Sequence, residues 1–166
     1  LDDWQEEVKA YEGDILLCTG RRVGKTEVLA QKAVDAMVKK KQNVIVVSIT
    51  EDQSQIIIQV ATDYAYRKYE KFIGKGRDKP KLKELVVAGQ KMQARPVGTT
   101  GDACRGFTGG ILIVDEAARM PTRFWMAAKP IILTTGGSIW MASTPFGKKG
   151  YFWKKFDEAY NQKEPK

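Results

Sequence analysis

Histidine is absent from this sequence of 166 residues. Its absence excludes His-ligated zinc sites and every catalytic arrangement that pairs a serine or a cysteine with histidine. Cysteine is nearly absent too. Cys18 and Cys104 are too few for a disulfide framework, and such a low content is typical of a reducing compartment. The longest apolar runs are the length of a strand, so we expect no membrane-spanning segment.

Acidic residues are the scarcer charged type. The chain has 28 Lys and Arg against 20 Asp and Glu, a net charge of +8, and 43% of its residues are hydrophobic. This composition excludes a highly charged disordered chain, and the length favours one domain spanning residues 1–166. Because the chain begins with Leu1, we expect a segment of a longer protein. The basic excess points to polyanions such as nucleotides or nucleic acid.

The basic residues are concentrated in two places. Between Arg67 and Lys83 there are eight basic residues and two acidic ones. A solvated helix end and loop would explain this run, and so would a surface that meets a phosphate backbone. A second cluster near the end of the chain leaves the same two interpretations open, and it consists of Lys148, Lys149, Lys154 and Lys155.

Hydrophobic periodicity predicts strands that alternate with helices. We expect strands at 14–18, 43–48, 111–114 and 138–142, shorter strands within 80–100, and helices at 3–11, 26–41, 52–72, 122–128 and 152–160. This alternation predicts an α/β fold with a parallel sheet and helices on both of its faces. In such sheets ligands bind at the carboxyl ends of the strands.

A glycine-containing loop lies between the first expected strand and the helix after it, with the sequence Thr19-Gly20-Arg21-Arg22-Val23-Gly24-Lys25-Thr26. Glycines let backbone N–H groups face phosphate oxygens, Lys25 would neutralise the β- and γ-phosphates, and the Thr26 hydroxyl would hold Mg²⁺. The loop departs from the usual pattern because Thr19 occupies the position of the first glycine. We predict that 19–26 bind nucleotide phosphates. The alternative is a glycine-rich turn with an exposed lysine.

Two carboxylates follow the apolar strand Ile111–Val114 directly. Asp115 would hold Mg²⁺ through its water shell, and Glu116 would act as the general base that polarises an attacking water. An ordinary strand that ends in a polar turn is the plain alternative. The loop at 19–26, called the phosphate-type loop below, argues against this alternative. A bare metal site for nuclease chemistry is a further alternative, but no additional carboxylate cluster supports it.

Together these residues resemble the ATPase domain of the large terminase subunit of tailed viruses, the motor that packages DNA into capsids. The resemblance runs along nearly the whole chain. The loop at 20–26 is similar to the deviant phosphate loop of that family, and Asp3-Trp4-Gln5 resembles its adenine-recognition element. Arg105-Gly106-Phe107 resembles its Arg-Gly element, and Ser143-Thr144-Pro145-Phe146-Gly147 resembles its coupling motif.

The resemblance implies a RecA-like P-loop NTPase of the class that has an additional strand and a catalytic glutamate. It implies that ATP is the substrate with Mg²⁺ and that Gln5 reads the adenine edge, for which an amide offers both a donor and an acceptor. Ser143, Thr144 and Pro145 would couple hydrolysis to motion. The arginine that stabilises the transition state would be Arg21 acting in cis or Arg105 acting on a neighbouring subunit, and the sequence does not choose between them.

The same resemblance implies ATP hydrolysis that powers translocation of double-stranded viral DNA into a procapsid. The implied partners are the DNA, further copies in a ring, the portal and the small terminase subunit. The implied location is the host cytoplasm, with transient docking on the procapsid. The residues after Tyr151 are too few for the family's nuclease domain. The alternatives are a helicase-like translocase lobe and a non-hydrolysing nucleic-acid or capsid-binding module on a vestigial ATPase fold.

Overall fold

A computed structural model describes residues 2–97 and 110–161. Its strands are β1 (Ile15–Cys18), β2 (Val44–Ser48), β3 (Glu84–Val87), β4 (Gln90–Pro96), β5 (Ile111–Asp115) and β6 (Ser138–Ser143). Its helices are α1 (Asp3–Ala10), α2 (Lys25–Lys40), α3 (Glu51–Tyr69), α4 (Thr122–Thr135) and α5 (Gly150–Asn161). These described residues also form the short 3₁₀ turns η1 (Glu70–Phe72), η2 (Gly76–Asp78) and η4 (Ala117–Arg119).

The strands form one sheet in the order β1-β6-β5-β2-β4-β3. The predicted α/β class is confirmed, and β6 lies as the additional strand between β1 and β5. The sheet is mixed rather than wholly parallel because β3 pairs with β4 in the antiparallel direction. Ala88 and Gly89 join these two strands with positive φ angles of 53° and 77°. Such a two-residue turn makes a hairpin, whereas a parallel connection needs a crossover of about a dozen residues or more.

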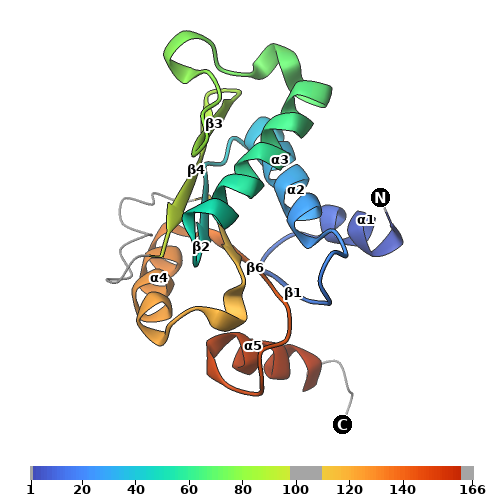
Figure 1. The fold of residues 1–166 in the computed structure, drawn as a ribbon, viewed down its shortest axis with the longest axis vertical. Coiled ribbons are helices and arrows are strands. Elements are labelled where there is room, and N and C mark those ends of the chain that lie inside the picture. Colours follow the sequence, from blue (N-terminus) through green and yellow to red (C-terminus); the bar gives the residue numbers. More distant parts are fainter. Residues whose placement is uncertain (1, 98–109, 162–166) are drawn as a thin grey trace.

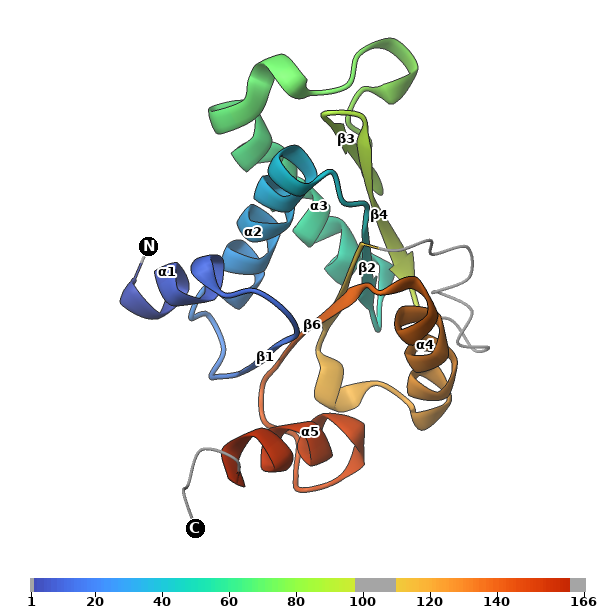
Figure 2. The same cartoon turned by 180° about the vertical axis from the view of Figure 1, so that it is seen from behind.

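Helices cover both faces of the sheet, as the alternation predicts (Figures 1 and 2). On one face, Val44 and Val46 of β2 join the buried cluster under α2 and α3. On the other face, Ile45 and Val47 join the cluster under α4 and α5. Because successive side chains of a strand point to opposite faces, a strand covered on both faces must be apolar throughout. This requirement explains the unbroken apolar runs in β2 and β5.

Two helices differ from their expected lengths. The helix expected at 52–72 ends at Tyr69, and the 3₁₀ turn η1 continues it. The helix expected at 122–128 continues through Pro130 to Thr135, so its predicted end was wrong. A proline in a helix interior lacks the N–H that would bond the carbonyl four residues earlier, and α4 continues past Pro130 without that bond. Within the described residues, no helix is both long and apolar enough to cross a membrane.

Gly110, just before β5, has a φ of +109°, and a Cβ atom there would collide with the Asn43 carbonyl oxygen. We expect Gly110→Ala to lower the free energy of unfolding by about 3 kcal/mol, because it adds a backbone clash to an unfavourable φ. Urea denaturation measures this loss. Gly136→Ala is the matched control: φ there is +67° and the space is open, so it should cost only about 1 kcal/mol. Equal losses in the two variants would contradict the clash.

Candidate functional site

The pairing of β6 brings the ends of three strands to one place. Cys18 of β1 lies opposite Ser143, and Asp115 of β5 lies opposite Ala142. Because these strands are parallel, the segments that follow them meet at the carboxyl edge of the sheet. A cavity of about 510 Å³ opens there, lined by 21–27 of the phosphate-type loop and first turn of α2, by Gln53, Ile56 and Val60 of α3, and by Asp115, Glu116 and Thr144.

Lys25 is the first residue of α2, and only 8% of its surface is exposed. Gly24 is the N-cap of this helix, and its φ of 85° turns the chain out of the loop. The ammonium Nζ of Lys25 donates to the Gly20 carbonyl at 2.5 Å and lies 3.5 Å from the Thr19 carbonyl. A buried ammonium needs such acceptors. A phosphate group in the cavity would offer a charged acceptor, which binds an ammonium more strongly than a carbonyl does.

The remaining loop residues divide into two groups. Thr19 and Gly20 supply the carbonyls that hold Lys25, and the Thr19 N–H donates to the Ser143 carbonyl at 3.2 Å, which ties the loop to β6. The exposed residues Arg21, Arg22 and Val23, together with the half-buried Thr26, line the cavity itself.

Asp115 ends β5 in a half-buried position on the same cavity as Thr26. Burial raises the pKa of its carboxyl group above the ordinary value, and the nearby Glu116 charge adds to this effect. The backbone N–H of Glu116 and the charge of Lys25 oppose it. A carboxylate and a hydroxyl are the hard oxygen donors that Mg²⁺ prefers, so Asp115 and Thr26 fit a magnesium site. Within 2–97 and 110–161 there is no cluster of three or more His, Cys, Asp or Glu that could hold a metal.

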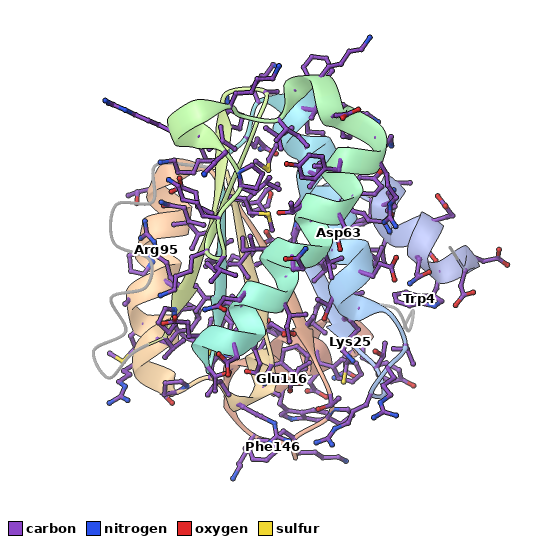
Figure 3. The ribbon with its side chains drawn as sticks, turned by 45° about the horizontal axis from the view of Figure 1, so that its top comes forward. Trp4, Lys25, Asp63, Arg95, Glu116 and Phe146 are labelled. Carbon is purple, nitrogen blue, oxygen red and sulfur yellow. The ribbon has the colours of Figure 1, made fainter. Side chains whose placement is uncertain are left out.

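Glu116 faces the segment that follows β6. Its backbone has a φ of 49°, a left-handed conformation that is costly for a residue with a side chain and recurs at functional sites. Its Oε2 atom lies 3.4 Å from both the Ser143 and the Thr144 hydroxyl oxygens. Glu116 and Lys25 lie on the same cavity, and Figure 3 shows both at the carboxyl edge. Of the predicted coupling residues, Ser143 and Thr144 are buried and Pro145 is exposed.

Gln5, the predicted adenine-reading residue, lies outside the cavity lining. It is buried on α1, where its Oε1 accepts from the Asp2 N–H at 2.9 Å. Its Nε2 donates to the Gly24 carbonyl at 3.4 Å, so both ends of the amide are engaged within the chain. The adenine role of Gln5 therefore stays a prediction. Arg105, the second candidate finger, lies outside the described residues.

Sequence reasoning missed the contribution of α3 to the cavity. Gln53, Ile56 and Val60 recur at a spacing of three and four residues, which places them on one helix face. Ile56 is 55% exposed there. The hydrophobic periodicity of α3 predicts the face that packs on the sheet. The face that lines the cavity has no such signal, and it is recognised only because the first turns of α3 lie beside the phosphate-type loop.

Residues 16–166 match a family described as "Terminase large subunit, T4likevirus-type, N-terminal". The chain belongs to this family. The match covers the loop after β1, the acidic end of β5 and all of β6. It agrees with the resemblance that the motifs carry, and it places residues 16–166 in the N-terminal part of a terminase large subunit.

Solved terminase structures share this fold. The ATPase domain of the Thermus phage P74-26 large terminase has a TM-score of 0.76 and 23% identity, covering 94% of this chain and 69% of that one. The HK97 bacteriophage large terminase has a TM-score of 0.71 and 14% identity, covering 99% of this chain and 37% of that one. A thermophilic bacteriophage large terminase in complex with ADP has a TM-score of 0.67 and 20% identity, covering 97% and 43%. No curated protein sequence matches the chain.

The raised pKa of Asp115 predicts how stability depends on pH. An unfolded Asp loses its proton near 3.8, while the folded carboxyl keeps it to higher pH. Between the pKa of the unfolded carboxyl and the higher pKa of the folded one, the folded chain holds one extra proton. The free energy of unfolding of the metal-free chain therefore falls as pH rises through this interval and is constant above the folded pKa. We expect Asp115→Asn to raise the free energy of unfolding at pH 7 by about 1 kcal/mol and to remove this pH dependence.

Urea denaturation between pH 3 and pH 8, in the presence of a chelator, measures this effect. Asp157→Asn is the control, because this exposed carboxylate on α5 lies outside the cavity lining. We expect that substitution to leave both the stability at pH 7 and its pH profile unchanged. A less stable Asp115→Asn variant at pH 7 would contradict the account of a costly buried charge.

Proposed function

We propose that this chain hydrolyses ATP to drive double-stranded viral DNA into a procapsid, as the motor domain of a terminase large subunit. One observation carries the proposal: Lys25, Asp115 and Glu116 lie on one cavity that is bounded by the phosphate-type loop and the end of β6. The family assignment supports a packaging role. The relatives solved in complex with ADP and with ATP-γ-S support nucleotide binding at this fold.

The chain's own groups would divide the chemistry between them. Lys25 would exchange the Gly20 carbonyl for the β- and γ-phosphates, and Thr26 and Asp115 would hold the magnesium ion. When bound, that ion would neutralise charge on the phosphate oxygens. Glu116 would orient a water for in-line attack on the γ-phosphate and accept its proton. The cavity volume of about 510 Å³ is within the range of small-molecule sites.

Arg21 and Arg105 remain the two candidates for the transition-state arginine. Arg21 is exposed and lines the cavity, so it could reach a γ-phosphate in cis. Arg105 lies outside the described residues, and its proposed role is in trans within a ring. A guanidinium in this role is worth roughly 10³–10⁵ in rate. We also propose that Gln5 reaches the adenine edge by exchanging its contacts with Asp2 and Gly24.

The larger machine is part of the same proposal. Residues 1–166 would form one ATPase domain of a longer subunit that also carries a nuclease. This subunit would assemble in a ring on the portal in the host cytoplasm, with the small terminase subunit as a further partner. The chain spans less than half of the longer terminase chains that it matches. Strand displacement without packaging would favour a helicase-like lobe, and absence of nucleotide binding would favour a vestigial module.

Two substitutions separate binding from turnover. Lys25→Ala should abolish binding of a fluorescent ATP analogue, because it removes the ammonium that pairs with the phosphates. Glu116→Gln should keep binding within about twofold and lower the rate of phosphate release by about 10² or more, since general-base catalysis contributes this much. Lys39→Ala, at the exposed C-terminal end of α2, is the control and should match the parent chain. A Glu116→Gln variant that releases phosphate at the parental rate would refute the mechanism.

The basic segment from Arg67 to Lys83 is the proposed DNA surface. It begins in the last turn of α3 and lies at the end of the molecule away from α5 and from the phosphate-type loop (Figure 1). Three of its cations are paired, with Asp35, Glu84 and Glu51. The other five are exposed and form no ion pair within the described residues, and they are Arg67, Lys71, Lys75, Arg77 and Lys79.

Helix α3 links this surface to the cavity. Gln53 and Ile56, near the N-terminal end of α3, line the cavity, and the basic segment begins in the last turn of α3. Its 19 residues span about 28 Å at 1.5 Å per residue. A change in the cavity that moves the first turns of α3 would therefore also move the basic segment.

Charge reversal tests this surface. The double variant Lys75→Glu with Lys79→Glu should weaken binding to a short blunt DNA duplex by about tenfold or more at moderate salt and reduce the salt slope by about 2, because two phosphate contacts are lost. Fluorescence anisotropy across a salt series measures both quantities. The double variant Lys148→Glu with Lys154→Glu changes the net charge equally and should retain most of the affinity. Equal losses in the two variants would contradict the assignment of the surface.

A further inference from the structure

Arg119 joins Glu116 to the loop that follows β6. Its Nε lies 3.6 Å from Glu116 Oε2, and its guanidinium carbon lies 4.2 Å from the centre of the Phe146 ring. Phe146 is 42% exposed and stands three residues after the end of β6. Figure 3 shows Phe146 beyond Glu116 at the carboxyl edge of the sheet. One guanidinium therefore lies close to both the predicted general base and an aromatic ring.

The backbone itself brings Glu116 and Arg119 together. Glu116 is the N-cap of η4, and the Arg119 N–H donates to the Glu116 carbonyl at 2.9 Å. In a 3₁₀ turn the side chains at positions i and i+3 eclipse one another. The costly left-handed conformation at Glu116 thus starts a turn that stacks the arginine over the carboxylate.

The other side of Glu116 is held by β6. The Ser143 hydroxyl accepts from the Ala118 N–H at 3.2 Å, and it lies 2.9 Å from the Thr144 carbonyl and 3.4 Å from Glu116 Oε2. A hydroxyl has a single proton to donate, so Ser143 serves one of those two acceptors at a time. The Thr144 hydroxyl, also at 3.4 Å, is the second donor to Glu116.

We propose that Arg119 is a positioning residue that clips the loop carrying Phe146 onto Glu116. The contacts close a ring: Glu116 to Arg119, Arg119 to Phe146, and the chain from Phe146 back to Thr144, which bonds Glu116. A movement of the loop after β6 is transmitted through this ring to the carboxylate. The inference rests on the proposed function, because it assigns a task to the same site.

The three side-chain contacts all use one oxygen of the carboxylate. Ser143, Thr144 and Arg119 each approach Oε2, and within the described residues Oε1 takes no part in these contacts. Oε1 is therefore the oxygen that can face a water in the cavity. In the proposed clip, Arg119 forms an ion pair with Oε2 and thereby holds Oε1 in one orientation toward the cavity. A misplaced reacting group costs up to about 10² in rate, which sets the scale of the effect that we expect.

Lys149 provides a matched comparison. Its Nζ lies 5.8 Å from the centre of the same Phe146 ring, and it forms no ion pair with Glu116. If a cation near Phe146 were sufficient, Lys149 and Arg119 would be equivalent. The planar guanidinium alone can stack on the ring and meet the carboxylate edge at the same time, whereas an ammonium is a point charge.

Steady-state phosphate release of single and double variants tests the clip. Arg119→Ala and Phe146→Ala should each lower kcat by about tenfold or more while KM changes less than about twofold, because both loosen the reacting group and leave the phosphate contacts intact. The double variant should be no slower than the slower single variant, since the two residues act through one contact. Arg119→Lys should restore only part of kcat, and Lys149→Ala should match the parent.

In the kinetics, an Arg119→Ala variant whose kcat equals or exceeds that of the parent would overturn the clip, and so would multiplicative losses in the double variant. Thermal unfolding of the parent, the two alanine variants and their double variant, without nucleotide, provides a readout that needs no activity. The shifts of the unfolding midpoint should be non-additive for Arg119 and Phe146, and additive shifts would show that the contact does not form. A parent chain that binds but does not hydrolyse ATP would refute the proposed function, and this thermal cycle would then decide on the contact alone.

Discussion

The position of β6 between β1 and β5 is the constraint on which the rest of the site depends. Ser143 lies opposite the last residue of β1, and Ala142 lies opposite the last residue of β5. The register of β6 thus determines where three segments leave the sheet relative to one another: the phosphate-type loop, Asp115 with Glu116, and Ser143 with Thr144. A shift of β6 by one residue would turn its buried side chains to the other face. Tight burial on both faces therefore fixes the geometry of the cavity.

Much of the fold is predictable from the sequence because its strands and helices have distinct periodicities. The apolar runs of β2 and β5 and the helical spacing of α2 identify these elements to within about one residue. The antiparallel pairing of β3 with β4 was not predicted. It depends on a hairpin turn, which the structure shows by the positive φ angles at Ala88 and Gly89. The predicted end of α4 was wrong because a proline usually ends a helix, whereas α4 continues through Pro130. Whether a helix continues past a proline depends on the surrounding packing, which the sequence does not show.

The candidate site was predictable where a motif specifies both residue type and neighbouring elements. Lys25, Asp115 and Glu116 lie on one cavity because each follows a strand of a parallel sheet. Three features needed the coordinates: the cavity face of α3, the engagement of Gln5 with Gly24, and the contact of Arg119 with Phe146. Each depends on distances between segments far apart in the chain, and such distances leave no periodic signal in the sequence.

We propose that Lys25 and Glu116 face the γ-phosphate of one bound ATP. A crystal structure of the chain with Mg²⁺ and a non-hydrolysable ATP analogue tests it most directly. We expect Lys25 Nζ, which now bonds the Gly20 carbonyl, to contact β- and γ-phosphate oxygens. We expect Glu116 to lie within one water of the γ-phosphate. A nucleotide bound elsewhere, with Lys25 still on the Gly20 carbonyl, would contradict the account.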